Sequence, residues 1–156
     1  MVWQDYQDSL VDSSGAGPPA PGPDGRRFAI LRHSQSEETH WDFLLDLPGR
    51  ARLATWRIDT DPLQWFAGEK KEFTAVVRAL PDHRRVYLTF EGPVSGDRGT
   101  VQRVDSGAAL LIQTGDQKTQ VELRGARLHV RISLLRDSDH PDLWHLCATP
   151  LGPVPT

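Results

Sequence analysis

Cysteine is almost absent from this 156-residue chain, which contains only Cys147. A single cysteine cannot form a disulfide within the chain, so an apolar core has to hold the fold together and a reducing compartment is expected. The N-terminus lacks the basic residues and the apolar run of a signal peptide, and no stretch approaches the roughly 18 apolar residues of a membrane helix. These absences predict a cytoplasmic protein with no membrane association.

An excess of basic charge is also missing, because 18 Lys and Arg residues stand against 21 Asp and Glu residues and give a net charge of −3. Residues 1–25 hold four of the acids and no base, so the rest of the chain carries 18 bases against 17 acids, a net charge of +1. Fifteen of the bases are Arg. The guanidinium group suits bidentate contacts with phosphate, but Arg is equally common on ordinary surfaces. Charge alone neither indicates nor excludes a nucleic-acid partner.

Apolar residues are scarce between Ser13 and Gly25, where Ser, Gly, Ala and Pro dominate. Such a composition cannot bury enough apolar surface to offset the entropy lost on ordering. We therefore expect residues 1–25 to form a flexible tail, residues 26–150 to fold as one domain, and residues 151–156 to form a short C-terminal tail.

Helical periodicity is rare after residue 26, where short β-branched or aromatic runs alternate with Gly, Pro and Asp. The candidate strands are residues 27–32, 40–47, 52–58, 72–78, 86–91, 99–104, 108–113, 119–123, 127–134 and 143–148. One helical turn is expected near residues 63–67. Many short strands in one domain usually close into a barrel or pack as a sandwich. We predict an all-β fold, a single small β-barrel of about eight to ten short, mostly antiparallel strands.

The segment that begins at His40 is the most informative one for function. On a strand, His40, Asp42 and Leu44 share one face, while Trp41 and Phe43 point to the other. An imidazole and a carboxylate two residues apart can reach the same metal ion, or they can simply pair with each other. The spacing alone leaves both interpretations open, and the simple pair is the commoner one.

Two further histidines favour the metal site. His33 ends the preceding candidate strand, so a hairpin would return it close to His40. His83 opens a later candidate strand, and Tyr87 would share its face. Imidazoles together with a carboxylate suit a hard to borderline divalent ion such as Mn²⁺ or Zn²⁺. The remaining histidines accompany the C-terminal strands, where we expect packing or surface roles: His129, His140 and His145.

At these residues the chain resembles the 3′-phosphoesterase domain of bacterial DNA ligase D. The hallmark of that family is a strand ending in His, a loop, and a segment of the form His-Tyr-Asp-Phe-Arg-Leu-Glu. The corresponding residues here are His33 and residues 40–46, with a loop between them that is one residue longer than usual. Further matching features are Trp56, the turn at residues 68–71, and the spacing from His83 to residues 90–92.

The resemblance implies a metal-dependent enzyme of DNA repair that trims 3′ ends, removing a terminal ribonucleotide or a 3′-phosphate before ligation. It implies that His33, His40 and Asp42 hold the metal, most commonly Mn²⁺, and that His83 and Tyr87 act as catalytic groups on the phosphate. The substrate would be a DNA end or a DNA/RNA primer-template. A separate ligase or polymerase would be the protein partner.

One family residue is missing, because Leu44 stands where the family has an Arg that pairs with the phosphate. Losing such a donor typically costs on the order of 10²- to 10³-fold in rate. Nearby cations that could replace it are Arg32, Arg57, Arg84 and Arg85. Two alternatives therefore stay open. The chain could bind metal and DNA ends with weakened or no turnover, which Leu44 favours, or it could act on a small phosphorylated molecule.

Overall fold

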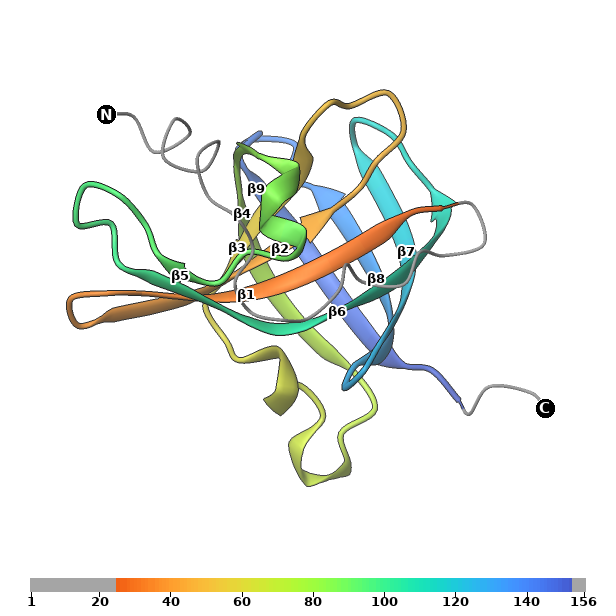
Figure 1. Cartoon of the computed structure of the whole chain (residues 1–156). Coiled ribbons are helices and arrows are strands. Elements are labelled where there is room, and N and C mark those ends of the chain that lie inside the picture. Colours follow the sequence, from red (N-terminus) through yellow and green to blue (C-terminus); the bar gives the residue numbers. More distant parts are fainter. Residues whose placement is uncertain (1–24, 153–156) are drawn as a thin grey trace.

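The computed structural model of the chain describes residues 25–152, and these residues form one antiparallel β-sheet that closes into a barrel (Figure 1). Closure arises because β1 pairs with β2 on one side and with β6 on the other. Eight strands make the ring in the order β1-β2-β3-β4-β9-β8-β7-β6, and the short β5 adds to the edge of β6. The predicted all-β barrel is confirmed. Of the tails expected at residues 1–25 and 151–156, residues 1–24 and 153–156 lie outside the described part of the chain.

The strands are β1 (Arg27–Gln35), β2 (Glu38–Leu45), β3 (Leu53–Ile58), β4 (Phe73–His83), β5 (Gly92–Pro93), β6 (Thr100–Gln113), β7 (Lys118–Gly125), β8 (His129–Arg136) and β9 (Leu143–Pro150). Three short 3₁₀ helices interrupt them: η1 (Pro62–Gln64), η2 (Ala67–Glu69) and η3 (Arg85–Leu88). The helical turns expected near residues 63–67 are thus present. No helix within residues 25–152 is both long enough and apolar enough to cross a membrane.

Two of the predictions about strands are wrong. Residues 86–91 do not form a strand, because η3 occupies their first half. Val86, Tyr87, Leu88 and Phe90 all face the outer wall of the barrel, and burying them together on that wall outweighs their strand-like alternation. Residues 99–104 and 108–113 belong to one long strand, β6, whose pairing with β1 shifts register between Ile30 and Leu31. Such a bulge lets a strand bend without ending.

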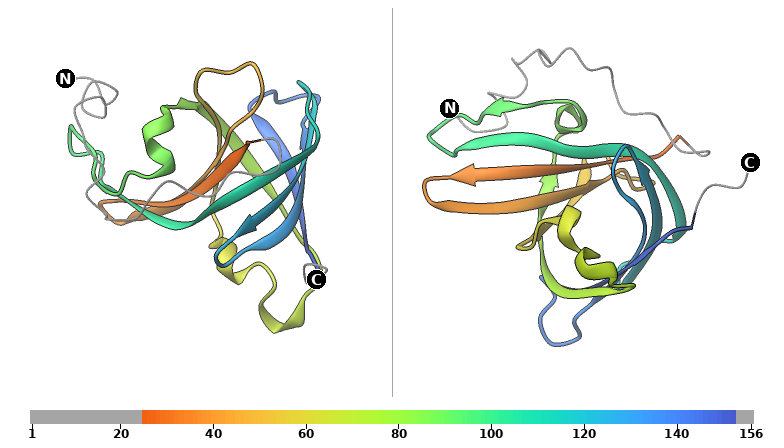
Figure 2. Two further views of the ribbon diagram at one scale, coloured as in Figure 1. Left: turned by 45° about the vertical axis from the view of Figure 1, so that its right-hand side comes forward. Right: turned by 90° about the horizontal axis from the view of Figure 1, so that it is seen from below.

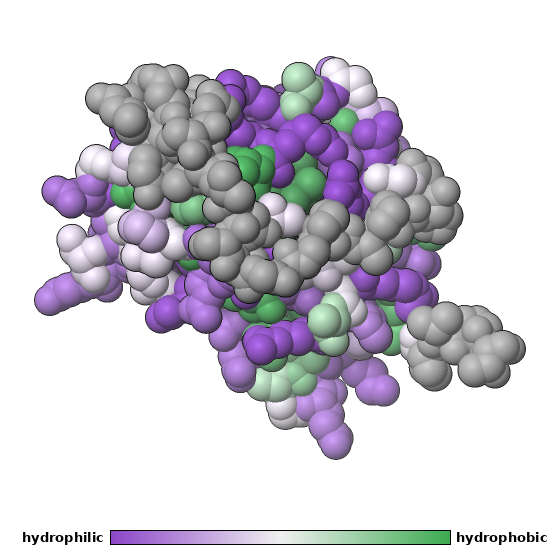
Figure 3. Space-filling view, viewed as in Figure 1, coloured by the Kyte–Doolittle hydropathy of each residue, from purple (hydrophilic) through white to green (hydrophobic). Residues whose placement is uncertain are grey.

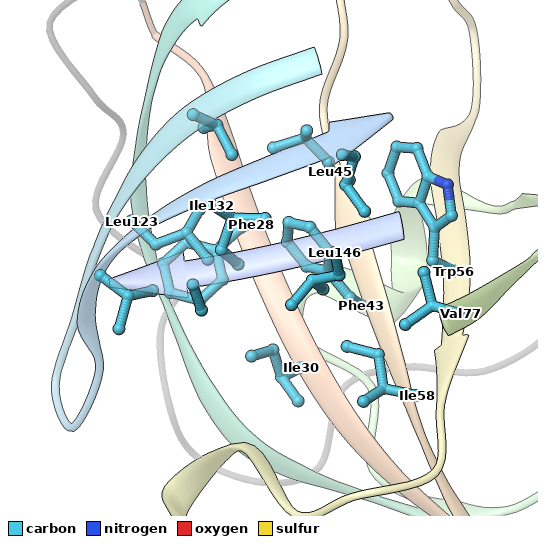
Figure 4. Close-up of a cluster of buried hydrophobic side chains, with 14 of the residues drawn as sticks. Phe28, Ile30, Phe43, Leu45, Trp56, Ile58, Val77, Leu123, Ile132 and Leu146 are labelled. Carbon is cyan, nitrogen blue, oxygen red and sulfur yellow. The ribbon is translucent and has the colours of Figure 1, made fainter. Parts of the chain in front are cut away.

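Alternation along the strands builds two apolar clusters on opposite faces of the barrel wall. The interior cluster fills the barrel and includes Phe28 and Ile30 of β1 and Phe43 of β2 (Figure 4). The outer cluster holds the alternate residues of the same strands, such as Leu31 and Leu44, beneath η3. Figure 2 shows η3 outside the barrel wall beside β1. In the space-filling view, hydrophilic side chains predominate on the face shown, with small apolar patches among them (Figure 3). This outer cover positions the candidate site.

A buried carboxylate ties β6 to the turn between β7 and β8. Asp105 is 4% exposed and accepts hydrogen bonds from four backbone N–H groups, at 2.7–3.1 Å. The donors are Ser106, Ala126, Arg127 and Leu128. The contact also requires a glycine at the turn, because a Cβ atom on Gly125 would lie 2.2 Å from the Asp105 carboxylate. The carboxylate therefore replaces the ladder hydrogen bonds that the turn lacks.

Replacing Asp105 with Asn should lower the free energy of unfolding by about 2–3 kcal/mol, since the amide turns one acceptor into a donor that faces backbone N–H groups. Urea denaturation measures the change. The exposed Asp97→Asn variant serves as the control and should shift stability by no more than ~0.5 kcal/mol. Equal losses in both variants would show that the Asp105 contacts contribute nothing specific.

Candidate metal centre

The β1–β2 hairpin brings His33 and His40 together. Their Cα atoms are direct partners across the two strands, and their ring centroids lie 4.8 Å apart. Asp42 follows on the same face of β2 and is 2% exposed. One ligand atom from each of these three residues lies within 4.8 Å of the other two. The proximity that the hairpin predicted from sequence is therefore present.

The carboxylate of Asp42 is the centre of this cluster. Its Oδ1 atom lies 3.0 Å from His40 Nε2, and its Oδ2 atom lies 3.9 Å from His33 Nδ1. The contact with His40 is not a hydrogen bond, and among the described residues Asp42 Oδ1 has no hydrogen-bond partner. A buried carboxylate oxygen without a partner is costly unless a cation neutralises it. Two imidazoles and this carboxylate are a donor set that fits a divalent metal ion.

Backbone carbonyls fix the orientation of two imidazoles. His33 Nε2 lies 2.5 Å from the carbonyl oxygen of Arg98, and His83 Nδ1 lies 2.9 Å from that of Pro81. A carbonyl oxygen only accepts, so each of these ring nitrogens carries the proton and donates it. In the neutral form of each ring, the opposite nitrogens, His33 Nδ1 and His83 Nε2, present lone pairs toward Asp42, at 3.9 and 3.8 Å. Metal-bound histidines are oriented by outer hydrogen bonds of this kind.

A glycine allows the loop that carries Arg98 to reach β1. Gly99 has φ of 87°, and a Cβ atom built there would lie 1.9 Å from the carbonyl oxygen of Ser34. A side chain at this position must push the loop away from the end of β1. The carbonyl of Arg98 would move with the loop and lose its contact with His33.

We expect Gly99→Ala to weaken Mn²⁺ binding by about tenfold, the usual cost of losing an outer hydrogen bond to a metal ligand. Gly96→Ala is a matched control, because Gly96 has a similar φ of 72° but its nearest atom is a flexible Arg98 side chain at 3.8 Å. Calorimetric titration with Mn²⁺ compares the two variants. Unchanged binding in Gly99→Ala, or equal weakening in Gly96→Ala, would contradict a role for the Arg98 carbonyl.

His83 and Tyr87 form the side of the cluster opposite the hairpin. His83 ends β4, Tyr87 lies in η3, and their ring centroids are 5.5 Å apart. A helical turn, rather than the shared strand face that we expected, brings them together. Burial lowers the pKa of His83 below its ordinary value, against the opposing effect of the Asp42 charge. Tyr87 is 1% exposed and also packs edge-on against Phe90.

Leu44 belongs to the apolar floor beside the cluster. It is fully buried and packs in the outer cluster with Leu53, Tyr87 and Leu88. A hydrocarbon side chain thus fills the position at which the family that the chain resembles has an Arg. The floor beside Asp42 offers water little access and supplies no charge of its own.

The four candidate arginines differ in their placement. Arg57 is the Cα partner of Asp42 on β3, so it shares the face of the cluster, and its Nε atom lies 3.0 Å from Asp59. Arg32 pairs with Trp41 and therefore points to the opposite face from His33. Arg57 is thus the arginine that the β-sheet register brings nearest to the carboxylate of the cluster.

The other two arginines flank the start of η3. Arg85 makes two hydrogen bonds to Asp46, at 2.8 and 3.0 Å, and the Arg85 guanidinium holds the pKa of that carboxyl below its ordinary value. This ion pair fastens η3 to the end of β2. Arg84 lies half-buried between His83 and η3. Arg85 therefore stabilises the position of η3 over the cluster, through its ion pair with Asp46.

Sequence reasoning missed the groups that support the cluster. The carbonyls of Pro81 and Arg98 and the close approach at Gly99 carry no side-chain signal. The partnership of Asp46 and Arg85 joins residues 39 positions apart, and only the fold reveals it.

No protein-family model matches the chain, and a search of curated proteins finds no relative. The resemblance to the ligase D phosphoesterase domain therefore stays a prediction. The barrel and the cluster of His33, His40 and Asp42 rest on the structure itself.

Proposed function

We propose that the chain is a metal-dependent phosphoesterase that processes 3′ ends of nucleic acid. The observation that carries this proposal is the cluster of His33, His40 and Asp42, in which Asp42 Oδ1 is buried without a hydrogen bond and a backbone carbonyl orients the imidazole of His33 toward the same carboxylate. This donor set lies on the outer wall of the barrel beside the half-exposed Arg57. Polar groups buried only for packing normally satisfy their hydrogen bonds within the protein, whereas this carboxylate oxygen does not.

A divalent ion held by these residues, with Mn²⁺ the leading candidate and Zn²⁺ the alternative, would polarise phosphoryl oxygens and lower the pKa of a bound water. The chain's own groups do the rest. Asp42 neutralises charge from a buried position, and His83 faces it with an unprotonated Nε2 that can join the ligands or accept a proton. Tyr87 packs against His83 and fixes its ring.

Two features support a nucleic-acid 3′ end as the substrate. First, His33, His40, Asp42, His83 and Tyr87 are all among the residues whose order and spacing resemble the ligase D domain. Second, Arg57 lies on the same face as Asp42, where a phosphate would need a cation. A DNA end or a DNA/RNA primer-template fits both. Processing of this kind would precede the work of a separate ligase or polymerase in the cytoplasm.

The test uses a primer-template that ends in a 3′-phosphate or in a single ribonucleotide, incubated with the full chain with and without Mn²⁺. We expect metal-dependent trimming that His40→Ala abolishes. His40 is half-buried at the end of a hairpin, so its replacement should leave the barrel folded. His129→Ala is the control, because His129 is exposed on β8 and its ring nitrogen is hydrogen-bonded to the Gly125 carbonyl. Trimming that survives His40→Ala would refute the proposal.

A second candidate is a module that binds metal and DNA ends without turnover, and buried Leu44 is the observation that favours it. The same assay separates the two, provided that binding of Mn²⁺ and of the labelled primer-template is measured in parallel. Binding without trimming would support the module. Absence of both metal and DNA binding would remove both candidates.

A further inference from the structure

A cavity lies at one end of the barrel. It measures about 170 Å³ and opens where the loops β2–β3, β6–β7 and β8–β9 meet, at the upper end of the barrel in Figure 1. We call it the mouth cavity. Its polar and aromatic lining includes Arg50, Trp56, Asp82, Asp116, Arg136 and Trp144. None of the cluster residues His33, His40 and Asp42 lines it.

Two tryptophans separate the mouth cavity from the interior of the barrel. Trp56 and Trp144 are 4% and 7% exposed, and their rings meet edge to face at 5.7 Å. Phe43 stacks on Trp56 from the core side, also at 5.7 Å (Figure 4). The aromatic layer gives the cavity a rigid apolar floor.

The floor carries two hydrogen-bond donors that the protein does not use. The Nε1–H groups of Trp56 and Trp144 are buried, and neither has a hydrogen-bond partner among residues 25–152. Buried indole N–H groups usually find an acceptor, because leaving them unpaired is costly. The two N–H groups lie beneath the surface of the cavity, and Trp65 shares this state outside it, so the two tryptophans contribute aromatic surface to the lining.

Arg136 supplies a positive charge at the same place. Its guanidinium lies 5.7 Å from the centre of the Trp144 ring and donates to two backbone carbonyls, those of Pro141 and Asp116. No carboxylate of the described residues forms an ion pair with it. By contrast, Arg50 pairs with Asp82 at 3.3 Å, and Asp116 is exposed at the rim, where solvent screens its charge. Arg136 is therefore the cation of this lining that no carboxylate of the described residues neutralises.

We propose that the mouth cavity binds a small aromatic carboxylate. Its size is close to that of cavities of ~150 Å³ that accept a single benzene ring. The ring would lie against the tryptophan floor, and the carboxylate would accept hydrogen bonds from Arg136. A guanidinium and a carboxylate match in planar geometry, which makes Arg136 the main determinant of affinity.

The test titrates benzoate into the full-length, ¹⁵N-labelled chain and follows the indole N–H signals, assigned with Trp→Phe variants. We expect the signals of Trp56 and Trp144 to shift and saturate together. Trp65 provides an internal control, because its Nε1–H is also buried without a partner but lies outside the cavity lining. Its signal should stay in place.

Two comparisons decide the chemistry. Arg136→Gln should weaken benzoate binding by at least about tenfold, whereas Arg131→Gln, on the same strand but paired with Glu122, should leave it unchanged. Benzyl alcohol, of similar size but neutral, should bind at least about tenfold more weakly than benzoate. The proposal fails if Trp56 and Trp144 do not respond, if Trp65 shifts equally, if Arg136→Gln binds as before, or if the alcohol binds as tightly.

Discussion

Replacing Asp42 with Asn is expected to lower the affinity for Mn²⁺ by more than about 100-fold. Loss of an outer hydrogen-bond partner already costs ~10- to 100-fold in metal affinity, and a carboxylate ligand contributes charge as well as a bond. The amide has the same shape, and it removes the negative charge that faces the nitrogens of His33, His40 and His83. Folding should be kept, because the apo protein no longer has to bury a carboxylate oxygen that lacks a hydrogen bond.

Calorimetric titration of the chelator-treated protein with Mn²⁺ gives the affinity. Asp59→Asn is the matched control, since Asp59 follows β3 on the exposed surface and pairs only with Arg57 among the described residues. Its affinity for Mn²⁺ should stay within about twofold of the parent, as expected for an exposed ion pair. If Asp42→Asn and Asp59→Asn bind the ion equally well, the metal lies elsewhere.

Replacing Leu44 with Arg is expected to lower the free energy of unfolding by roughly 3–5 kcal/mol, because it buries an unpaired charge. Leu44 is fully buried and packs with Tyr87 and Leu88 in the outer cluster, which consists of apolar side chains. With a urea m-value of ~1–3 kcal/mol per molar, the midpoint should fall by at least about 1 M. One substitution at Leu44 is therefore not expected to restore the Arg that the ligase D family carries at this position.

Two control variants separate the effect of losing the apolar contacts of Leu44 from the effect of adding a charge. Leu44→Met keeps the apolar contacts and should cost less than about 1.5 kcal/mol. Leu135→Arg introduces the same charge on the outer face of β8, where the side chain is 50% exposed, and should change stability by ~0.5 kcal/mol or less. A Leu44→Arg protein that stays as stable as the parent and trims 3′ ends faster would show that the site is open beside Asp42.

Alternation of apolar and polar residues was sufficient to predict the barrel and the face that carries the site. Phe43 turns inward while Asp42 and Leu44 turn outward, as a period of two requires. The hairpin between His33 and His40 followed from the short polar loop between two strands. These features are local, so the sequence contains them directly.

Residues 86–91 show where such reasoning stops. Val86, Leu88 and Phe90 alternate like a strand, yet η3 forms because Tyr87 is apolar too and all four can cover the same outer wall. Which segment covers a wall depends on contacts between distant strands, and alternation says nothing about these. For the same reason the carbonyls that orient His33 and His83 could not be foreseen.

The central claim is that His33, His40 and Asp42 bind one divalent metal ion. Electron paramagnetic resonance of Mn²⁺ added to the chelator-treated full chain tests it most directly, because free Mn²⁺ and histidine-coordinated Mn²⁺ give different spectra. We predict one bound ion per chain, with coupling to imidazole nitrogen that weakens in His33→Ala and again in His33→Ala/His40→Ala. A bound ion without nitrogen coupling, or the same coupling in the double variant, would contradict the claim.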